Sequence, residues 1–360
     1  MNSVSLRLIF PIAVLFLSGT AYTAAAFNAP FTISGIPVVA KKKPKEYDCE
    51  SVPDPIISID APSSYRQDDP TRSTIDEESR KEYLEKVTPL REYNQAIVKM
   101  ANTYTEGKYD RSAVAECAKD WLLEWADADA LSNLNQGTAQ LHIGQTLAAL
   151  SFSVMQFGND PAFDAESKTK ILNWLASIAK TMINFVDSRE DRRTSENNIR
   201  YWNGLGAVSV AVVTNDQSMF NWGVESARIG IRQIREDGSL PTEMLRAGRA
   251  RKYHFFAAQP LVATAEIAAA NGIDLYSEER GALHRLVKLL INTYDDTSFF
   301  EQKTGAKQVT EGGKIQENEI AWLYIYNNRF PSPQAERILS DYPDLAASAL
   351  GGNVKLLYGH

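Results

Sequence analysis

The sequence predicts an all-α protein whose helices form an incomplete α/α toroid, a barrel of helical hairpins with a cleft. Apolar residues recur at helical spacing in one segment after another, and no period-two alternation persists. The breaks between these segments are short and carry Gly, Asn, Asp or Pro, which is typical of hairpin turns. Segments 204–213 and 260–270 are apolar on more than one face, as expected for helices buried between neighbours. A four-helix bundle, the alternative architecture, has too few helices.

The first 26 residues have the pattern of a secretory signal peptide. Arg7 provides the basic start, 8–17 is an apolar run, and Ala24-Ala25-Ala26 suits a signal peptidase. The run is shorter than the roughly 20 residues that a membrane-spanning helix needs, which disfavours the alternative of an uncleaved anchor. We therefore expect a periplasmic protein that begins near Phe27 and has no membrane contact after cleavage.

Residues 27–80 are predicted to form an extended arm, because prolines recur in it and disfavour helix. The arm contains Cys49, and the only other cysteine is Cys117 in the helical part. An even number of cysteines in an oxidising compartment predicts one disulfide, which would tie the arm to a helix. Two cysteines without a histidine partner do not make a zinc site.

The helical domain is predicted to cover 81–360. Its first helix runs from about Glu78 toward Tyr104, with Asp76 or Ser79 as the N-cap. A second helix at 113–126 places two tryptophans at i and i+4 on one face, which we interpret as core residues. The later helices are expected at about 137–157, 165–187, 195–213, 217–235, 253–271, 279–293, 316–329 and 333–340.

Charge and motif content exclude several classes of function. A formal net charge of −7 makes the chain a poor partner for nucleic acid, so any polyanionic partner would need a local basic patch. The four histidines show no metal-binding spacing, and no phosphate-binding glycine loop or Gly-x-Ser-x-Gly elbow is present. We therefore predict no metal and no organic cofactor, and we expect a monomer.

The segment 197–202, Asn-Asn-Ile-Arg-Tyr-Trp, concentrates groups that can hold a sugar acid. If Ser195 or Glu196 caps the helix, Asn197 and Asn198 lie in its first turn. Free backbone N–H groups and the helix dipole favour a carboxylate at that position. The alternative is that the two asparagines serve only to cap the helix.

A second candidate lies at 246–254, where four cations fall within seven residues of an acidic protein. Arg246 and Arg249 belong to this run, and an arginine can bind a carboxylate through two parallel hydrogen bonds. Tyr253 and His254 follow directly and supply a possible proton donor and a possible base. The alternative is a solvated charge run that precedes a helix.

Taken together, these residues resemble the alginate lyase family, polysaccharide lyase family 5, whose members cleave poly-mannuronate by β-elimination. The resemblance implies an incomplete α/α toroid with a substrate cleft, a periplasmic location and an acidic polysaccharide as partner. It extends from about Cys49 to the C-terminus. Its best blocks are 197–202, 211–215, 220–222, 271–275, 281–283, 301–305 and 321–323.

The sequence departs from the family at the positions that move protons. Ile199 stands where the family motif Asn-Asn-His has its histidine. Seven residues after Arg249, Phe256 stands where the family has its proton-transferring tyrosine. Ser64 aligns with a lysine that the family places near substrate. Loss of a general base costs a factor of about 10²–10⁴, so the inherited mechanism cannot operate unchanged.

Three hypotheses follow. In the first, a rearranged lyase site uses Tyr253 or His254 for proton transfer on a uronic-acid polysaccharide. The second is a catalytically inactive protein that binds polysaccharide during its export or modification. The third is a structural helical protein that has lost the cleft. For the first two, the candidate substrate-binding residues are Asn197, Asn198, Tyr201, Trp202, Arg246 and Arg249.

Overall fold

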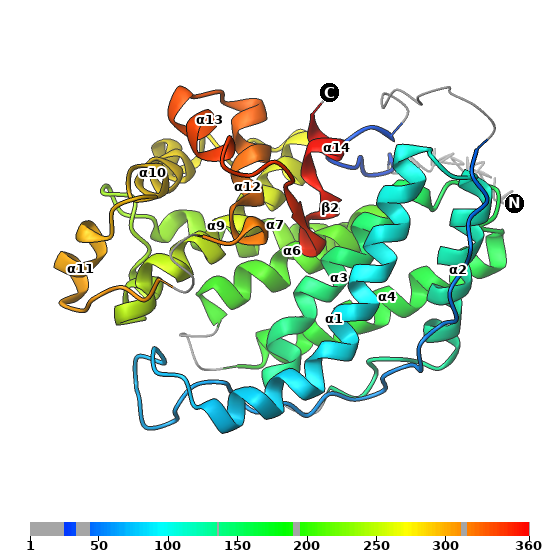
Figure 1. Ribbon diagram of the computed structural model, residues 1–360, viewed down its shortest axis with the longest axis horizontal. Helices are drawn as coiled ribbons and strands as arrows, with labels where there is room; N and C mark the ends of the chain where they lie inside the picture. The colour runs from blue at the N-terminus through cyan, green and yellow to red at the C-terminus, as the bar shows by residue number, and fades with distance from the viewer. Residues whose placement is uncertain (1–24, 34–43, 135–136, 190–194, 311–314, 360) are drawn as a thin grey trace, which may run out of the picture.

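The structure, a computed structural model, describes residues 25–33, 44–134, 137–189, 195–310 and 315–359. It is built mainly from helices that follow one another as hairpins (Figure 1), which confirms the all-α prediction. The pairs are α1 (Glu77–Glu106) with α2 (Arg111–Asp127), α3 (Gly137–Phe157) with α4 (Ala165–Asp187), α6 (Asn198–Thr214) with α7 (Gln217–Gln233), α9 (Ala250–Ala270) with α10 (Glu278–Asn292), and α12 (Glu317–Arg329) with α13 (Pro333–Leu339).

The hairpins form two layers. Helices α1, α3, α6, α9 and α12 make the inner layer, in which each helix packs on the next, and each carries its hairpin partner outside. The C-terminal segment 346–358 contacts both α12 and α1, so it lies between the two ends of the inner layer (Figure 1). It contains β1 (Ala346–Ala347), paired antiparallel with β2 (Gly352–Asn353), the turn η3 (Ser348–Leu350) and α14 (Val354–Tyr358). This arrangement is the predicted incomplete toroid.

Local sequence explains where the helices begin and how closely they pack. Asp76, Asp110 and Asp164 each accept a hydrogen bond from a backbone N–H in the first turn of the following helix. Such caps contribute about 1 kcal/mol each. In the inner layer, a Cβ on Gly206 of α6 would lie 2.7 Å from the carbonyl oxygen of Gly144 on α3. Only glycine at this position lets the two helices approach so closely.

Several bounds differ from prediction for local reasons. The helix expected from 195 begins at Asn198, because the Asn197 side chain is itself the cap and accepts from the backbone N–H of Ile199. The helix expected from 253 begins at Ala250. The short elements α8 (Pro241–Met244), η2 (Ala247–Arg249), α11 (Ser298–Thr304) and the two strands were not predicted. They are too short for a periodic pattern.

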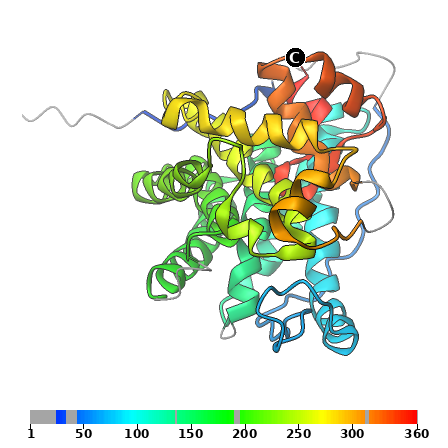
Figure 2. The ribbon, with the colours of Figure 1, turned by 90° about the vertical axis from the view of Figure 1, so that its left-hand side faces the viewer.

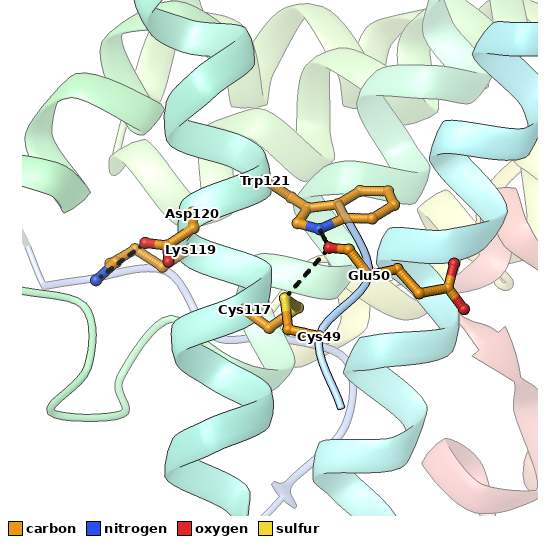
Figure 3. Close-up of a disulfide and its surroundings, with 6 residues drawn as sticks. All are labelled: Cys49, Glu50, Cys117, Lys119, Asp120 and Trp121. Carbon is orange, nitrogen blue, oxygen red and sulfur yellow. Dashed lines mark hydrogen bonds and ion pairs between the residues drawn. A yellow bond between two sulfur atoms is a disulfide. The ribbon is translucent and has the colours of Figure 1, made fainter. Parts of the chain in front are cut away.

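The arm is fastened to the helices at several points. Cys49 and Cys117 form the predicted disulfide, with their Cα atoms 5.7 Å apart (Figure 3). Beside it, the indole N–H of Trp121 donates to the carbonyl of Glu50. The indole N–H of Trp125 donates to the carbonyl of Pro53. The two tryptophans are therefore core residues, as predicted, and they also hold the arm.

The segments before α1 reach two different parts of the toroid. Near the start of the described chain, the ring of Phe27 stacks on Phe220 of α7 with centroids 4.1 Å apart. Residues 62–76 turn back at the lower end of the molecule (Figure 2), where they meet the chain that leads into α9. Most of the predicted signal peptide lies outside the described residues. Within the described ranges, no helix is both long and apolar enough to cross a bilayer.

Candidate functional site

A cleft of about 940 Å³ opens on the inner side of the toroid. Its walls come from α1, α3, α9, α12 and the C-terminal segment, together with Ile59 and Ala61 of the arm. Trp202 of α6 and Phe256 of α9 lie side by side in its wall, with ring centroids 5.1 Å apart. The cleft predicted from the family resemblance is therefore present, and the predicted substrate-binding residue Trp202 lines it.

Next to this wall, two tyrosines from distant parts of the chain meet. The hydroxyl of Tyr253 on α9 lies 2.8 Å from the hydroxyl of Tyr65 on the arm. We call Tyr65 and Tyr253 the tyrosine pair. The ring of Tyr253 also contacts Phe256 edge to face, with centroids 6.0 Å apart, so the tyrosine pair adjoins the cleft.

Two arginines surround the tyrosine pair. The guanidinium carbon of Arg246 lies 3.5 Å from the ring centroid of Tyr253 and 4.9 Å from that of Tyr65. The guanidinium carbon of Arg249 lies 5.6 Å from the Tyr65 ring centroid. Burial raises the pKa of the Tyr253 phenol, and the positive charge of Arg246 opposes that rise. Both predicted arginines therefore lie at the site together with Tyr253.

The arm holds these arginines in place. Nη2 of Arg246 donates a hydrogen bond to the carbonyl of Arg72 at 2.6 Å, and Nε of Arg249 donates to the carbonyl of Ser73 at 2.8 Å. Ser64, which stands where the family has a lysine, directly precedes Tyr65, and its carbonyl accepts from the backbone N–H of Asp76. The arm therefore brings a phenol to the site at the position next to the missing lysine.

The start of α6 does hold a carboxylate, but this carboxylate belongs to the chain itself. The backbone N–H and the side-chain Nδ2 of Asn198 donate to the two oxygens of Glu243, at 2.9 and 2.8 Å. Asn198 is buried and does not line the cleft. Asn197 caps the helix, which was the alternative interpretation. This geometry does not fit the predicted contact of Asn198 with a substrate carboxylate.

Two other predicted residues lie in the core. His254 is fully buried, its Nδ1 donates to the carbonyl of Ala250, and its Nε2 accepts from the backbone N–H of Leu240. Burial lowers its pKa to about 4. With both nitrogens engaged, His254 does not fit the predicted role of base or acid. Tyr201 is also buried and donates its hydroxyl to the carbonyl of Glu196, so it does not fit direct substrate binding.

Sequence reasoning missed two residues of this site. Tyr65 lies in an irregular arm, 188 positions from its partner Tyr253 in the sequence. No periodic pattern could have connected the two. Glu243 lies in the four-residue helix α8, and nothing in the sequence around it distinguishes it from the other acidic residues of the chain. The described residues contain no group of three or more His, Cys, Asp or Glu side chains that could hold a metal ion.

We expect Glu243 to make stability depend on pH. Burial raises its pKa from 4.5 to about 7, although the hydrogen bonds from Asn198 oppose the rise. Since the folded state binds this proton more tightly than the unfolded chain, Glu243 by itself lowers the free energy of unfolding as the pH rises from about 4.5 to about 7. The buried neutral His254, whose pKa is lowered from 6.5 to about 4, acts in the opposite direction over nearly the same range. The contribution of Glu243 should be roughly 3 kcal/mol, and urea unfolding of the wild type and of Glu243→Gln at several pH values isolates it.

The variant Glu243→Gln provides the control for this prediction. At any single pH, the unfolding free energy of the variant will differ from that of the wild type. Asn198 donates from its backbone N–H and from Nδ2 to the two carboxylate oxygens of Glu243, and a glutamine has only one oxygen to accept. The informative quantity is therefore the slope against pH. An equal slope for the variant and the wild type between pH 4.5 and 7 would show that Glu243 is not the group responsible.

Comparison with known proteins agrees with this fold and cleft. The profile of the alginate lyase family matches residues 133–300. An alginate lyase of Pseudomonas paraeruginosa is 30% identical over 331 residues, which cover 89% of this chain and 88% of that protein. An alginate lyase of Cobetia marina is 27% identical over 325 residues, which cover 87% of this chain and 84% of that protein.

Solved structures show the same architecture. Alginate lyase A1-III from Sphingomonas species A1 superposes with a TM-score of 0.76 at 24% identity, covering 88% of both chains. A variant of alginate lyase A1-III complexed with a tetrasaccharide gives a TM-score of 0.78 at 24% identity, again over 88% of both chains. The fold and its cleft thus define a helical toroid of the kind found in these solved structures. The sequence match is more specific than the fold, because it reaches 30% identity over 89% of this chain. The chain belongs to the alginate lyase family.

Proposed function

We propose that the protein cleaves a uronic-acid polysaccharide by β-elimination, with a site rearranged around Tyr253. The observation that carries this proposal is the hydrogen bond of 2.8 Å between the hydroxyls of the tyrosine pair, with the Arg246 guanidinium over the Tyr253 ring. The names of the relatives and the tetrasaccharide held by the A1-III variant support a polysaccharide as the substrate.

The arginines supply the electrostatic part of the reaction. The guanidinium of Arg249 is buried against the arm, so it acts through its positive charge on the carboxylate of a uronate that enters beside the tyrosine pair. Neutralising that carboxylate makes the C5 proton more acidic, because negative charge develops on the carboxylate in the transition state. Arg246 stabilises the phenolate form of Tyr253 from the face of the ring. Neither cation carries a proton, but together they make proton transfer to the Tyr253 phenolate feasible.

The tyrosine pair can complete the proton balance. The Tyr253 phenolate takes the C5 proton, the C5–H electrons form the C4=C5 double bond, and the C4–O4 bond breaks. The Tyr65 hydroxyl gives its proton to the departing O4 and becomes the phenolate. Transfer of the new Tyr253 proton across the 2.8 Å hydrogen bond then restores the starting state. The cycle needs neither Ile199 nor Phe256.

The test is to incubate the purified protein with a panel of uronic-acid polysaccharides and follow the ultraviolet absorbance of the unsaturated product. Since burial raises the pKa of Tyr253, the phenolate is the minor form near neutral pH. We therefore expect kcat/KM to rise by roughly tenfold per pH unit on the alkaline side of neutrality. No absorbance increase on any polymer at any pH would contradict the proposal, and a rate that falls with pH would contradict the role of the phenolate.

Two observations favour a second candidate function, an inactive polysaccharide-binding protein. The side chain that faces the cleft at position 256 is a phenylalanine, which cannot move a proton. The hydrogen bonds that engage Asn198 also remove it from the substrate. Calorimetric titration separates the two functions: heat of binding to an acidic polymer without any unsaturated product would identify the binding protein.

We also propose that the protein works in the periplasm. The signal-peptide pattern of residues 1–26 and the disulfide between Cys49 and Cys117 support export, because disulfides persist in oxidising compartments. Cell fractionation followed by mass measurement of the secreted form tests this. A protein that stays in the cytoplasm with its first 26 residues attached would contradict it.

A further inference from the structure

Two cations of the cleft wall are not balanced by an anion, and both lie on α1. Arg91 and Lys99 line the cleft, and no carboxylate of the described residues lies within ion-pair distance of either. The other charged residues of the wall each have a partner of opposite sign, in the pairs Lys252–Glu319 and Lys108–Glu106. The side of the cleft that α1 forms is therefore positively charged.

Arg91 lies at the end of the cleft where the tyrosine pair is found. Helix α1 begins directly after the turn of the arm that carries Tyr65 (Figure 1). In α1, Tyr83 also lines the cleft, and its hydroxyl accepts a hydrogen bond of 3.2 Å from Nη2 of Arg91. Burial raises the pKa of the Tyr83 phenol, the charge of Arg91 opposes that rise, and the Tyr65 phenol adds to it. Tyr83 and Arg91 therefore lie within electrostatic range of the tyrosine pair.

The residues that were predicted to hold a substrate carboxylate are engaged elsewhere. Asn198 donates to a carboxylate of the chain itself, and Arg249 is buried and donates to the arm. Arg91 is exposed in the cleft, and only one of its five N–H donors is directed at the Tyr83 hydroxyl. Its remaining donors can bind a carboxylate through two parallel hydrogen bonds.

We propose that Arg91 binds the carboxylate of the uronate at the tyrosine pair, and that Tyr83 is a positioning residue that holds the guanidinium toward the cleft. Because a uronate is placed at the tyrosine pair, this inference rests on the function proposed above. Lys99 lies two turns further along α1, about 12 Å away along the helix axis, and its ammonium has no planar fork. It therefore contributes only a general attraction for an acidic polymer.

The test compares an oligomannuronate with the neutral oligomannose of the same length and linkage, in which a hydroxymethyl group replaces each carboxylate. Both are titrated by calorimetry into the mature protein carrying Tyr253→Phe, in which we expect no cleavage during the measurement. Adding Arg91→Gln should weaken binding of the oligomannuronate about tenfold and leave binding of the oligomannose unchanged. Equal weakening for both ligands, unchanged affinity for the acidic one, or no binding of it by the parent protein would overturn the inference.

Two further variants separate a specific contact from general charge. Arg91→Lys keeps the positive charge but loses the planar fork, so it should weaken binding of the oligomannuronate nearly as much as Arg91→Gln does. Lys99→Gln removes the same charge from the same wall and should weaken binding only about twofold. If Arg91→Lys binds like the parent protein, or if Lys99→Gln loses as much as Arg91→Gln, the wall acts through charge alone and the inference is wrong.

The role of Tyr83 has its own test. Tyr83→Phe should weaken binding of the oligomannuronate severalfold, and it should have no further effect when Arg91→Gln is already present, because the hydroxyl acts through Arg91. A matched pair lies near the other end of α1 and outside the cleft wall, where the guanidinium carbon of Arg111 is 5.4 Å from the Tyr104 ring centroid. Tyr104→Phe should therefore not change the affinity for either ligand. An equal loss from Tyr83→Phe with and without Arg91→Gln would overturn the positioning role.

The two proposals fail in different ways. If the oligomannuronate binds through Arg91 but no polymer yields an unsaturated product, the lyase proposal fails and the inference about Arg91 stands. If an unsaturated product forms while Arg91→Gln keeps the parental affinity and the wild-type kcat/KM, the lyase proposal stands and the inference fails.

Discussion

Replacing Tyr253 with phenylalanine should lower kcat/KM for β-elimination by about 10²–10⁴, the range typical of a lost general base or acid. The substitution removes only the hydroxyl, so the ring stays beneath Arg246 and against Phe256. Binding of the polymer, measured by calorimetry, should change little. A decrease in kcat with an unchanged dissociation constant is the result that identifies a proton carrier.

The chain contains a matched control for this experiment. The hydroxyls of Tyr294 and Tyr342 also lie 2.8 Å apart, away from the cleft. Tyr294→Phe therefore removes a hydrogen bond of the same kind, and both variants should lose about 1 kcal/mol of unfolding free energy. Only Tyr253→Phe should lose activity. If Tyr253→Phe keeps more than a tenth of the wild-type rate, or if Tyr294→Phe loses as much, Tyr253 is not the proton carrier.

Removing the disulfide should have the largest effect on stability. Cys49 and Cys117 are separated by 68 positions in the sequence, and a crosslink of that span stabilises by about 4 kcal/mol through the lost entropy of the unfolded chain. The double substitution to serine should therefore lower the free energy of unfolding by about that amount. Urea unfolding, followed by circular dichroism, provides the measurement.

The wild-type protein treated with a reductant provides the control for the disulfide. Its unfolding free energy should fall to that of the double variant, and the reductant should have no effect on the variant. A difference of less than about 1 kcal/mol between oxidised and reduced wild type would mean that the arm is held by its other contacts. Those contacts include the hydrogen bonds from Trp121 and Trp125.

Much of the fold could be predicted because it depends on long, periodic helices. The helix predicted at 165–187 is found with those bounds, and Asp164 is its N-cap. The predicted Cys49–Cys117 bond is found as well, since only one pairing is possible with two cysteines. The prediction was wrong where one side chain made a local hydrogen bond, as at Asn197, which caps α6 so that the helix begins at Asn198 and not at 195.

The site was predictable only in part. The cluster of cations at 246–252 singled out Arg246, whose guanidinium lies over the Tyr253 ring, and Arg249, whose guanidinium lies over the Tyr65 ring. His254 was adjacent in sequence and equally titratable, but the helix turns it by about 100° from Tyr253 and into the core. Whether a side chain faces the cleft or the core depends on which helix packs on which face. This information comes from tertiary contacts that a short segment does not contain.

The position of the C-terminal segment 346–358, between α12 and α1, has a consequence for biosynthesis. The cleft wall includes Ala346–Ala347 and Gly352, close to the last described residue, and the site also needs Tyr65 from the arm. A ribosome-bound chain that has Arg249 and Tyr253 still lacks one wall of the cleft. The cleft can therefore form only after the chain has been made as far as Gly352. A recombinant fragment limited to residues 133–300, the part that matches the family profile, would for the same reason contain α9 without the complete cleft.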